Sequence, residues 1–152
     1  MRRDYKEEFY KKNFENERNY LKFQLLNQWL RLKNRGIRFQ EFFVDQQVQK
    51  IALYGLGELG QLFAEEMASD DLIHIEYGID RNAREEWQGL KVYQLENLPN
   101  RVDAIIISPV MVTDEIEDEI YELLGEMKTF TIEEILYELS RKYHVSSRLW
   151  EV

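Results

Sequence analysis

The chain has 152 residues, of which 44% are hydrophobic, and it contains no cysteine. This length and composition suit one globular domain with a sizeable core, alone or extended by an appendage, rather than a disordered chain. The lack of cysteine excludes disulfides, thiolate metal sites and a cysteine nucleophile.

The formal net charge of −9 is unevenly distributed. Residues 1–40 carry eleven Lys or Arg against five Asp or Glu, and residues 41–152 carry nine against twenty-four. An acidic surface repels phosphate backbones, so we expect the main domain not to bind nucleic acid. The basic segment is expected to dock on an acidic surface of its own domain or of a neighbouring subunit, and an anionic membrane or RNA is the alternative.

Residues 1–47 are predicted to form a helical N-terminal arm. Its main apolar stripe recurs at steps of four, four and three residues and is widened by two further leucines. The stripe consists of Leu21, Leu25, Trp29 and Leu32, with Leu26 and Leu30 beside it. Gly36 stands where a helix would end, and a short helix is expected from Phe39 to Gln46. Because a lone helix cannot bury its own stripe, the arm is expected either to pack on the domain or to form the seam of a homodimer or a complex with a partner enzyme.

Residues 48–152 alternate between strand and helix patterns. The expected strands are Lys50–Tyr54, Leu72–Ile79, Leu90–Tyr93, Val102–Ile107 and Lys128–Phe130. The expected helices are Glu58 to about Ala68, Asp114–Met127, and a last helix that starts at Thr131 and runs to about Tyr143. This order predicts an α/β protein of three layers, in which right-handed crossovers build a parallel sheet of about five strands.

A glycine-rich turn follows the first expected strand. It consists of Gly55, Leu56, Gly57, Glu58, Leu59 and Gly60, and its glycines have the spacing G-x-G-x-x-G. In a dinucleotide-binding loop the first glycine permits the tight turn, the second lets a phosphate approach the backbone, and the third lets helix and strand pack closely. The free amides at the start of the helix then attract an anion.

Three polar residues extend this candidate site. Asp80 lies twenty residues beyond the last glycine of the loop, where an acid binds a ribose hydroxyl in such folds. Its neighbour Arg81 can stack on an adenine or face a 2′-phosphate. Ser108, after the strand Val102–Ile107, is placed to bind the far end of a ligand, although ending the strand before Pro109 is the more ordinary role.

Glu58 argues against tight binding of a pyrophosphate. A helix N-terminus offers an anion about 0.3–1 kcal/mol, whereas a carboxylate ~6 Å from a phosphate charge costs roughly 3 kcal/mol at an effective dielectric constant of 20. Glu58 therefore cancels the helix dipole if it points into the site. If it points away, it is an ordinary acid in the first turn of a helix.

The sequence offers no catalytic or metal-binding set. A proton-transfer pair of Tyr and Lys four residues apart is missing, because Tyr93, Tyr121 and Tyr137 are followed at that spacing by Asn97, Gly125 and Arg141. The acidic run from Asp114 to Glu119 has the spacing of a solvated helix face rather than of a metal site.

Five segments occur in an order that resembles a known class of module. They read IALYGLGELG, YGIDRNA, QGLKVYQLENLP, VDAIIISP and TIEEIL, and they cover roughly residues 49–139. The chain resembles the small Rossmann-type modules of bacterial nucleotide-sugar and surface-polysaccharide pathways, such as the N-terminal domain of sugar-nucleotide acetyltransferases and the C-terminal domain of sugar C-methyltransferases. The resemblance implies a Rossmann-like fold that binds NAD(P) or a nucleotide sugar through Gly55, Gly57, Gly60 and Asp80.

We therefore expect a cytoplasmic nucleotide-binding accessory module without membrane contact, since no apolar run or N-terminal signal points to a membrane or to export. One alternative is a protein-interaction scaffold whose pocket is empty. Another is a small oxidoreductase that completes its active site across a dimer, with Tyr or Lys residues of the arm reaching Ser108.

Overall fold

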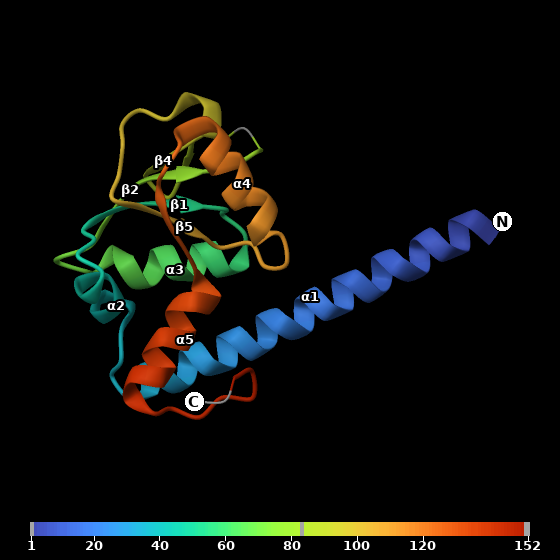
Figure 1. Ribbon diagram of the computed structural model, residues 1–152, viewed down its shortest axis with the longest axis horizontal. Coiled ribbons are helices and arrows are strands. Elements are labelled where there is room, and N and C mark those ends of the chain that lie inside the picture. The colour runs from blue at the N-terminus through green and yellow to red at the C-terminus, as the bar shows by residue number, and fades with distance from the viewer. Residues whose placement is uncertain (1, 83, 151–152) are drawn as a thin grey trace.

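The computed structural model describes residues 2–82 and 84–150, and within them the chain forms a mixed α/β structure with a six-stranded sheet (Figure 1). The helices are α1 (Arg2–Asn34), α2 (Phe39–Asp45), α3 (Glu58–Ala68), α4 (Thr113–Leu124) and α5 (Ile132–Tyr143), with a single 3-10 turn, η1 (Leu95–Asn97). The strands are β1 (Lys50–Tyr54), β2 (His74–Ile79), β3 (Glu86–Trp87), β4 (Leu90–Tyr93), β5 (Ala104–Ile107) and β6 (Lys128–Thr131). None of these helices is both long and apolar enough to cross a lipid bilayer.

The strands lie in the order β3-β4-β2-β1-β5-β6, and all neighbours from β4 to β6 are parallel. Among the described residues the sheet thus has one strand more than the five expected, and the additional strand is the two-residue β3, antiparallel to β4. The turn between β3 and β4 consists of Gln88 and Gly89, which both have positive φ, at 48° and 83°. Two-residue hairpin turns of this kind match the twist of the strands. A two-residue strand is too short to show a periodicity in sequence.

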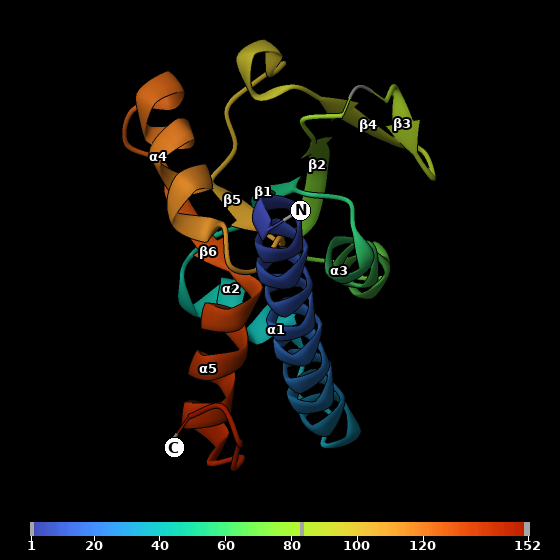
Figure 2. The ribbon, with the colours of Figure 1, turned by 90° about the vertical axis from the view of Figure 1, so that its right-hand side faces the viewer.

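The two faces of the sheet are covered unequally. Along β1, Ile51 and Leu53 belong to one apolar cluster, and Ala52 and Tyr54 belong to the other, because successive side chains of a strand point to opposite faces. Helices α1, α2, α3 and α5 lie on the first face, while α4 and η1 cover the second (Figure 2). The sheet and the helices on its two faces form three layers, as expected.

The second half of α1 is part of the larger core cluster. Leu25, Trp29 and Leu32 are buried there, so this stripe packs on the chain's own domain. The expectation that Leu30 widens the stripe is wrong, because its side chain is 57% exposed. The buried face turns instead toward α5, where Gln28 is buried and its Nε2 donates to the Ser140 hydroxyl at 2.9 Å.

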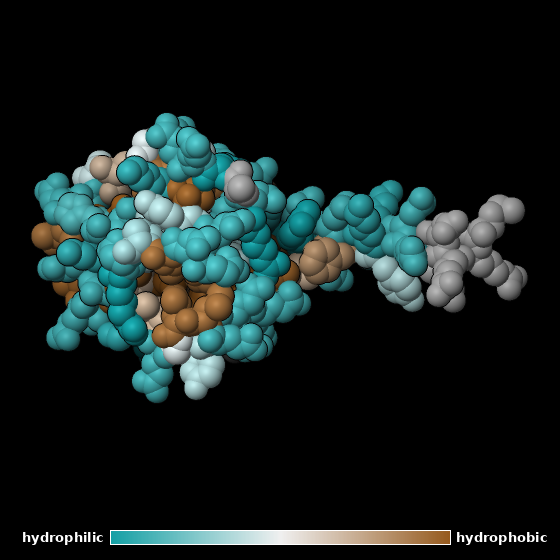
Figure 3. Space-filling model, turned by 90° about the horizontal axis from the view of Figure 1, so that it is seen from above, coloured by the Kyte–Doolittle hydropathy of each residue, from teal (hydrophilic) through white to brown (hydrophobic). Residues whose placement is uncertain are grey.

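The first half of α1 extends beyond the body of the molecule (Figure 3). In this half the side chains of Tyr10 and Phe14 are 67% and 42% exposed. The helix therefore has two parts, one that belongs to the core and one that reaches past the sheet.

The turn between α1 and α2 confirms the helix end expected at Gly36. This glycine has φ of 75°, its N–H donates to the carbonyl of Lys33, and the N–H of Ile37 donates to the carbonyl of Leu32. This pair of hydrogen bonds is a Schellman motif, which satisfies carbonyls that the end of a helix leaves free. The motif turns the chain directly into α2.

A buried carboxylate joins α1, α2 and α3. Glu66 of α3 is 8% exposed, and its Oε1 accepts from the indole N–H of Trp29 at 2.9 Å. Its Oε2 accepts at 3.2 Å from the backbone N–H of Phe39, the first residue of α2, which no side chain of its own helix caps. The rings of Trp29 and Phe39 also stack, with centroids 4.7 Å apart.

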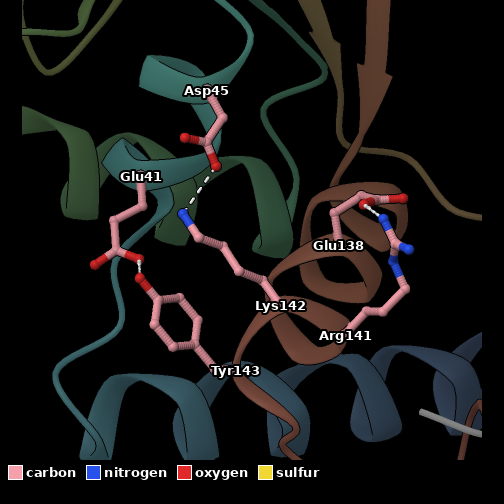
Figure 4. Close-up of polar contacts among 6 residues, drawn as sticks. All are labelled: Glu41, Asp45, Glu138, Arg141, Lys142 and Tyr143. Carbon is pink, nitrogen blue, oxygen red and sulfur yellow. Dashed lines mark hydrogen bonds and ion pairs between the residues drawn. The ribbon is translucent and has the colours of Figure 1, made fainter.

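Exposed polar contacts connect α5 to α2 (Figure 4). Lys142 forms an ion pair with Asp45 at 2.9 Å, and the Tyr143 hydroxyl donates to Glu41. Exposed ion pairs contribute little to the free energy of unfolding. These contacts therefore affect the orientation of α5 more than its stability on the domain.

We expect Glu66→Ala to lower the free energy of unfolding by about 2–4 kcal/mol, because two buried N–H donors lose their acceptor. The matched control is Glu65→Ala, which removes an exposed carboxylate from the same helix and should change stability by less than about 0.5 kcal/mol. Urea unfolding followed by circular dichroism measures both. Equal effects of the two substitutions would contradict the role assigned to Glu66.

Candidate functional site

At the carboxyl ends of the neighbouring strands β1 and β5, the chain connections run to opposite sides of the sheet. From β1 the chain continues to β2 on one side of it, while β5 lies on its other side. The last residues of the two strands, Tyr54 and Ile107, pair in parallel register. In open α/β sheets ligands bind in the crevice outside such a point. The glycine loop follows Tyr54, and Ser108 follows Ile107.

Close packing accounts for Gly55 and Gly60. A Cβ at Gly60 would lie 2.1 Å from the carbonyl oxygen of Gly55, and one at Gly55 would lie 2.7 Å from Pro109 Cδ. Gly55 also has φ of 92°, in the left-handed region that favours glycine. These two glycines are needed for the turn and for the approach of α3 to β1, whether or not a ligand binds.

Gly57 differs from both of them. Apart from Gly57 itself and its two chain neighbours, no atom of the described residues lies within 4 Å of the position of a Cβ at Gly57, and its φ of −78° and ψ of −163° suit any residue. It is also the N-cap of α3, so it has no side chain to accept from the first amides of that helix. Folding therefore does not require glycine here, and its absent side chain keeps the space in front of α3 open.

The other loop residues divide between core and surface. Leu56 and Leu59 are 3% and 2% exposed, so their side chains belong to the core and only their backbone is available to a ligand. Glu58 is exposed, and it lines the pocket in front of the loop.

Ser108 is buried, and its hydroxyl lies 2.9 Å from the carbonyl oxygens of both Tyr54 and Gly55, to which it donates. Its single proton thus holds the end of β5 against the glycine loop. Only the lone pairs of its oxygen remain for a ligand, although the residue lines the pocket.

The glycine loop and α1 enclose a pocket of about 180 Å³, here called the loop pocket. Gly57, Glu58 and Gly60 line one side. The arm contributes Phe14, Arg18 and Lys22, which are one helical turn apart and so share one face of α1.

Sequence analysis did not name Phe14, Arg18 or Lys22 as part of the nucleotide site, although one alternative placed Tyr or Lys residues of the arm near Ser108. The signal was present, because residues 18–40 contain six Lys or Arg and no Asp or Glu. The spacing of four residues places Arg18 and Lys22 on one helix face. What the sequence could not supply is the direction in which that face points.

A second pocket, here called the Asp80 pocket, has a volume of about 350 Å³ and lies at the ends of β1, β2 and β4. Its polar lining is mainly acidic, with Asp80, Glu96 and Glu119 beside the single cation Arg81. Asp80 is half-buried, and its Oδ1 accepts from the N–H of Asn82 at 3.0 Å.

Arg81 is already engaged within this pocket. Its Nη2 lies 2.8 Å from Glu119 Oε1 in an ion pair with α4, and its Nε donates to the Tyr54 hydroxyl at 3.3 Å. These two partners, Tyr54 and Glu119, raise the pKa of Arg81 above its ordinary value. Burial raises the pKa of the Tyr54 phenol, and the guanidinium opposes that rise. Tyr54 is therefore a neutral hydroxyl near neutral pH.

The chain matches no protein-family model and no curated protein sequence. Within residues 2–82 and 84–150, no three His, Cys, Asp or Glu side chains lie close enough together to hold a metal ion.

We expect Gly60→Ala to lower the free energy of unfolding by about 2 kcal/mol or more, because the added methyl group meets a backbone carbonyl. Gly57→Ala meets nothing, and it should change stability by less than about 0.5 kcal/mol. Thermal and urea unfolding of the two variants measure this contrast. Equal destabilisation by both substitutions would show that Gly57 also serves the fold.

Proposed function

We propose that the protein is a Rossmann-like nucleotide-binding module whose ligand is NAD(P) or a nucleotide sugar. The parallel strand order β4-β2-β1-β5-β6, with the glycine loop after β1, supports this proposal. The ligand would lie along the carboxyl ends of the strands, with its phosphates at the glycine loop and a ribose at Asp80.

The observation that carries the proposal is the open position at Gly57. Since neither its backbone angles nor its surroundings demand glycine, the residue makes sense as a place where a phosphate approaches the backbone. The uncapped amides of α3 supply the hydrogen bonds that such an anion requires.

The charges of the Asp80 pocket favour a ribose with free hydroxyls. Three carboxylates and one cation line it, and that cation, Arg81, is paired with Glu119. A 2′-phosphate would meet repulsion there, whereas a carboxylate accepts hydrogen bonds from ribose hydroxyls. We therefore favour NAD, or a nucleotide sugar, over NADP.

The module is proposed to act as an accessory in bacterial carbohydrate or envelope metabolism, as the resemblance to nucleotide-sugar modules implies, and in the cytoplasm. We assign no catalytic residue to this chain. Any turnover would then depend on a partner enzyme that acts on the bound nucleotide.

A protein-interaction scaffold is the second candidate, and one surface of α1 favours it. Tyr20, Phe23 and Leu30 are 65%, 60% and 57% exposed on this helix. Exposed apolar side chains gathered on one element are typical of binding surfaces. This face is also where a homodimer or a partner enzyme would contact the arm.

In a thermal-shift titration with NAD, NADP, UDP-glucose and S-adenosylmethionine, we expect NAD or UDP-glucose to raise the unfolding midpoint by roughly 5–10 °C at about a hundred times the dissociation constant. Asp80→Ala should reduce this shift to less than half, because the ribose loses its acceptor.

The matched control is Asp71→Ala, which removes an exposed carboxylate outside both pockets and should leave the shift unchanged. If folded protein shifts with none of these compounds, the nucleotide-binding proposal is wrong. The exposed face of α1 would then be the surface to study.

A further inference from the structure

We infer that the N-terminal helix α1 forms part of the ligand site. Its side chains Arg18 and Lys22 bind the diphosphate of the ligand in the loop pocket. This inference rests on the proposed nucleotide-binding function and extends it, because it names the chemical group that the arm recognises. It also assigns α1 a role beyond its share of the core.

The first observation is an unsatisfied donor on Arg18. Its Nε is inaccessible to solvent and, among the described residues, has no hydrogen-bond acceptor. Buried N–H groups without a partner are rare in folded proteins, because each loses its hydration without compensation. The guanidinium also lies near the Phe14 ring, whose centroid is 6.0 Å from Cζ. Arg18 therefore lines the loop pocket with one buried N–H, that of Nε, that has no acceptor among the described residues.

The second observation is the balance of charge in the loop pocket. Arg18 and Lys22 line it together with one carboxylate, that of Glu58. Within the described parts of the chain neither cation forms an ion pair, with Glu58 or with any other acid. The two cations outnumber the carboxylate, and their attraction would oppose the repulsion that Glu58 exerts on an anion at this loop.

The third observation is the size and the walls of the pocket. The pocket has a volume of about 180 Å³ and is bordered by the glycine loop on one side and by α1 on the other. A diphosphate can lie between these two walls, and the rest of a nucleotide would extend outside this pocket toward Asp80. Gly57 leaves the wall opposite the arm open, so an anion can contact both the amides of α3 and the cations of α1.

These observations together define the ligand class. A compound with a diphosphate, such as NAD or a nucleotide diphosphate sugar, can satisfy Arg18, Lys22 and the loop at once. S-adenosylmethionine has no phosphate, and its sulfonium cation would meet two like charges. The ligand would also bridge the body of the protein and the arm, so that its binding fixes α1 in place.

The test compares the full chain with an arm variant, Arg18→Gln/Lys22→Gln, by calorimetric titration with inorganic diphosphate, NAD and UDP-glucose. The control, Lys33→Gln/Arg35→Gln, removes one lysine and one arginine from exposed positions at the far end of the same segment. We expect the arm variant to bind at least ten-fold more weakly than the full chain, and the control to remain within about two-fold of it. Unfolding midpoints of both variants should match that of the unaltered chain.

The outcomes separate this inference from the proposed function. If the arm variant binds NAD or UDP-glucose as tightly as the control does, the arm does not hold the phosphates, although nucleotide binding stands. If inorganic diphosphate binds through the arm and no nucleotide does, the anion site stands and the nucleotide proposal fails. If the unaltered chain binds none of the three probes, both are wrong. Asp80→Ala should weaken nucleotide binding only, and an equal loss of diphosphate binding would contradict separate pockets for ribose and phosphate.

Discussion

The carboxylate of Glu66 joins three of the helices on one face of the sheet, because it is buried in α3 and its two oxygens accept from α1 and α2. A buried charge is costly unless its lone pairs are used, so α1 and α2 must present Trp29 and Phe39 at this point. This contact ties α1 to α3 near the C-terminal part of both helices. Eleven residues earlier, about 16 Å along the axis, α1 brings Arg18 to the loop at the start of α3. The position of the site thus depends on a hydrogen bond made at the other end of these helices.

The carboxyl edge of the sheet offers two pockets of opposite character. The loop pocket has two cations, one carboxylate and uncapped helix amides, whereas the Asp80 pocket has three carboxylates and one cation that is already paired. Phosphates and ribose hydroxyls need these two kinds of environment, and a nucleotide diphosphate contains both groups. The separation of charge along this edge is therefore the physical basis for the proposed ligand.

A glycine motif alone would not justify that proposal, because a fold does not imply a function. Gly55 and Gly60 are explained by the turn and by helix packing, and an empty scaffold would need them as well. Gly57 and the unpartnered Nε of Arg18 are different, since folding explains neither. Gly57 and Arg18 both line the loop pocket, which is why the proposed function rests on Gly57 and the role of the arm on Arg18, rather than on the motif.

Local signals in the sequence were enough to predict the order of the helices, the strands Lys50–Tyr54 and Leu90–Tyr93, and the glycine loop, because each depends on neighbours within one turn or one strand. The helix expected to reach Met127 ends instead at Leu124, because Gly125 has a positive φ of 71°, which does not continue a right-handed helix. The hairpin that contains β3 was beyond such signals, since two residues have no periodicity. The arm face that carries Arg18 could be grouped from its spacing, but its direction could not be predicted. That direction follows from a contact between residues 37 positions apart, and only tertiary packing decides such a contact. The sequence by itself therefore determined the order of elements and the loop, and the tertiary structure alone decided that the arm completes the pocket in front of it.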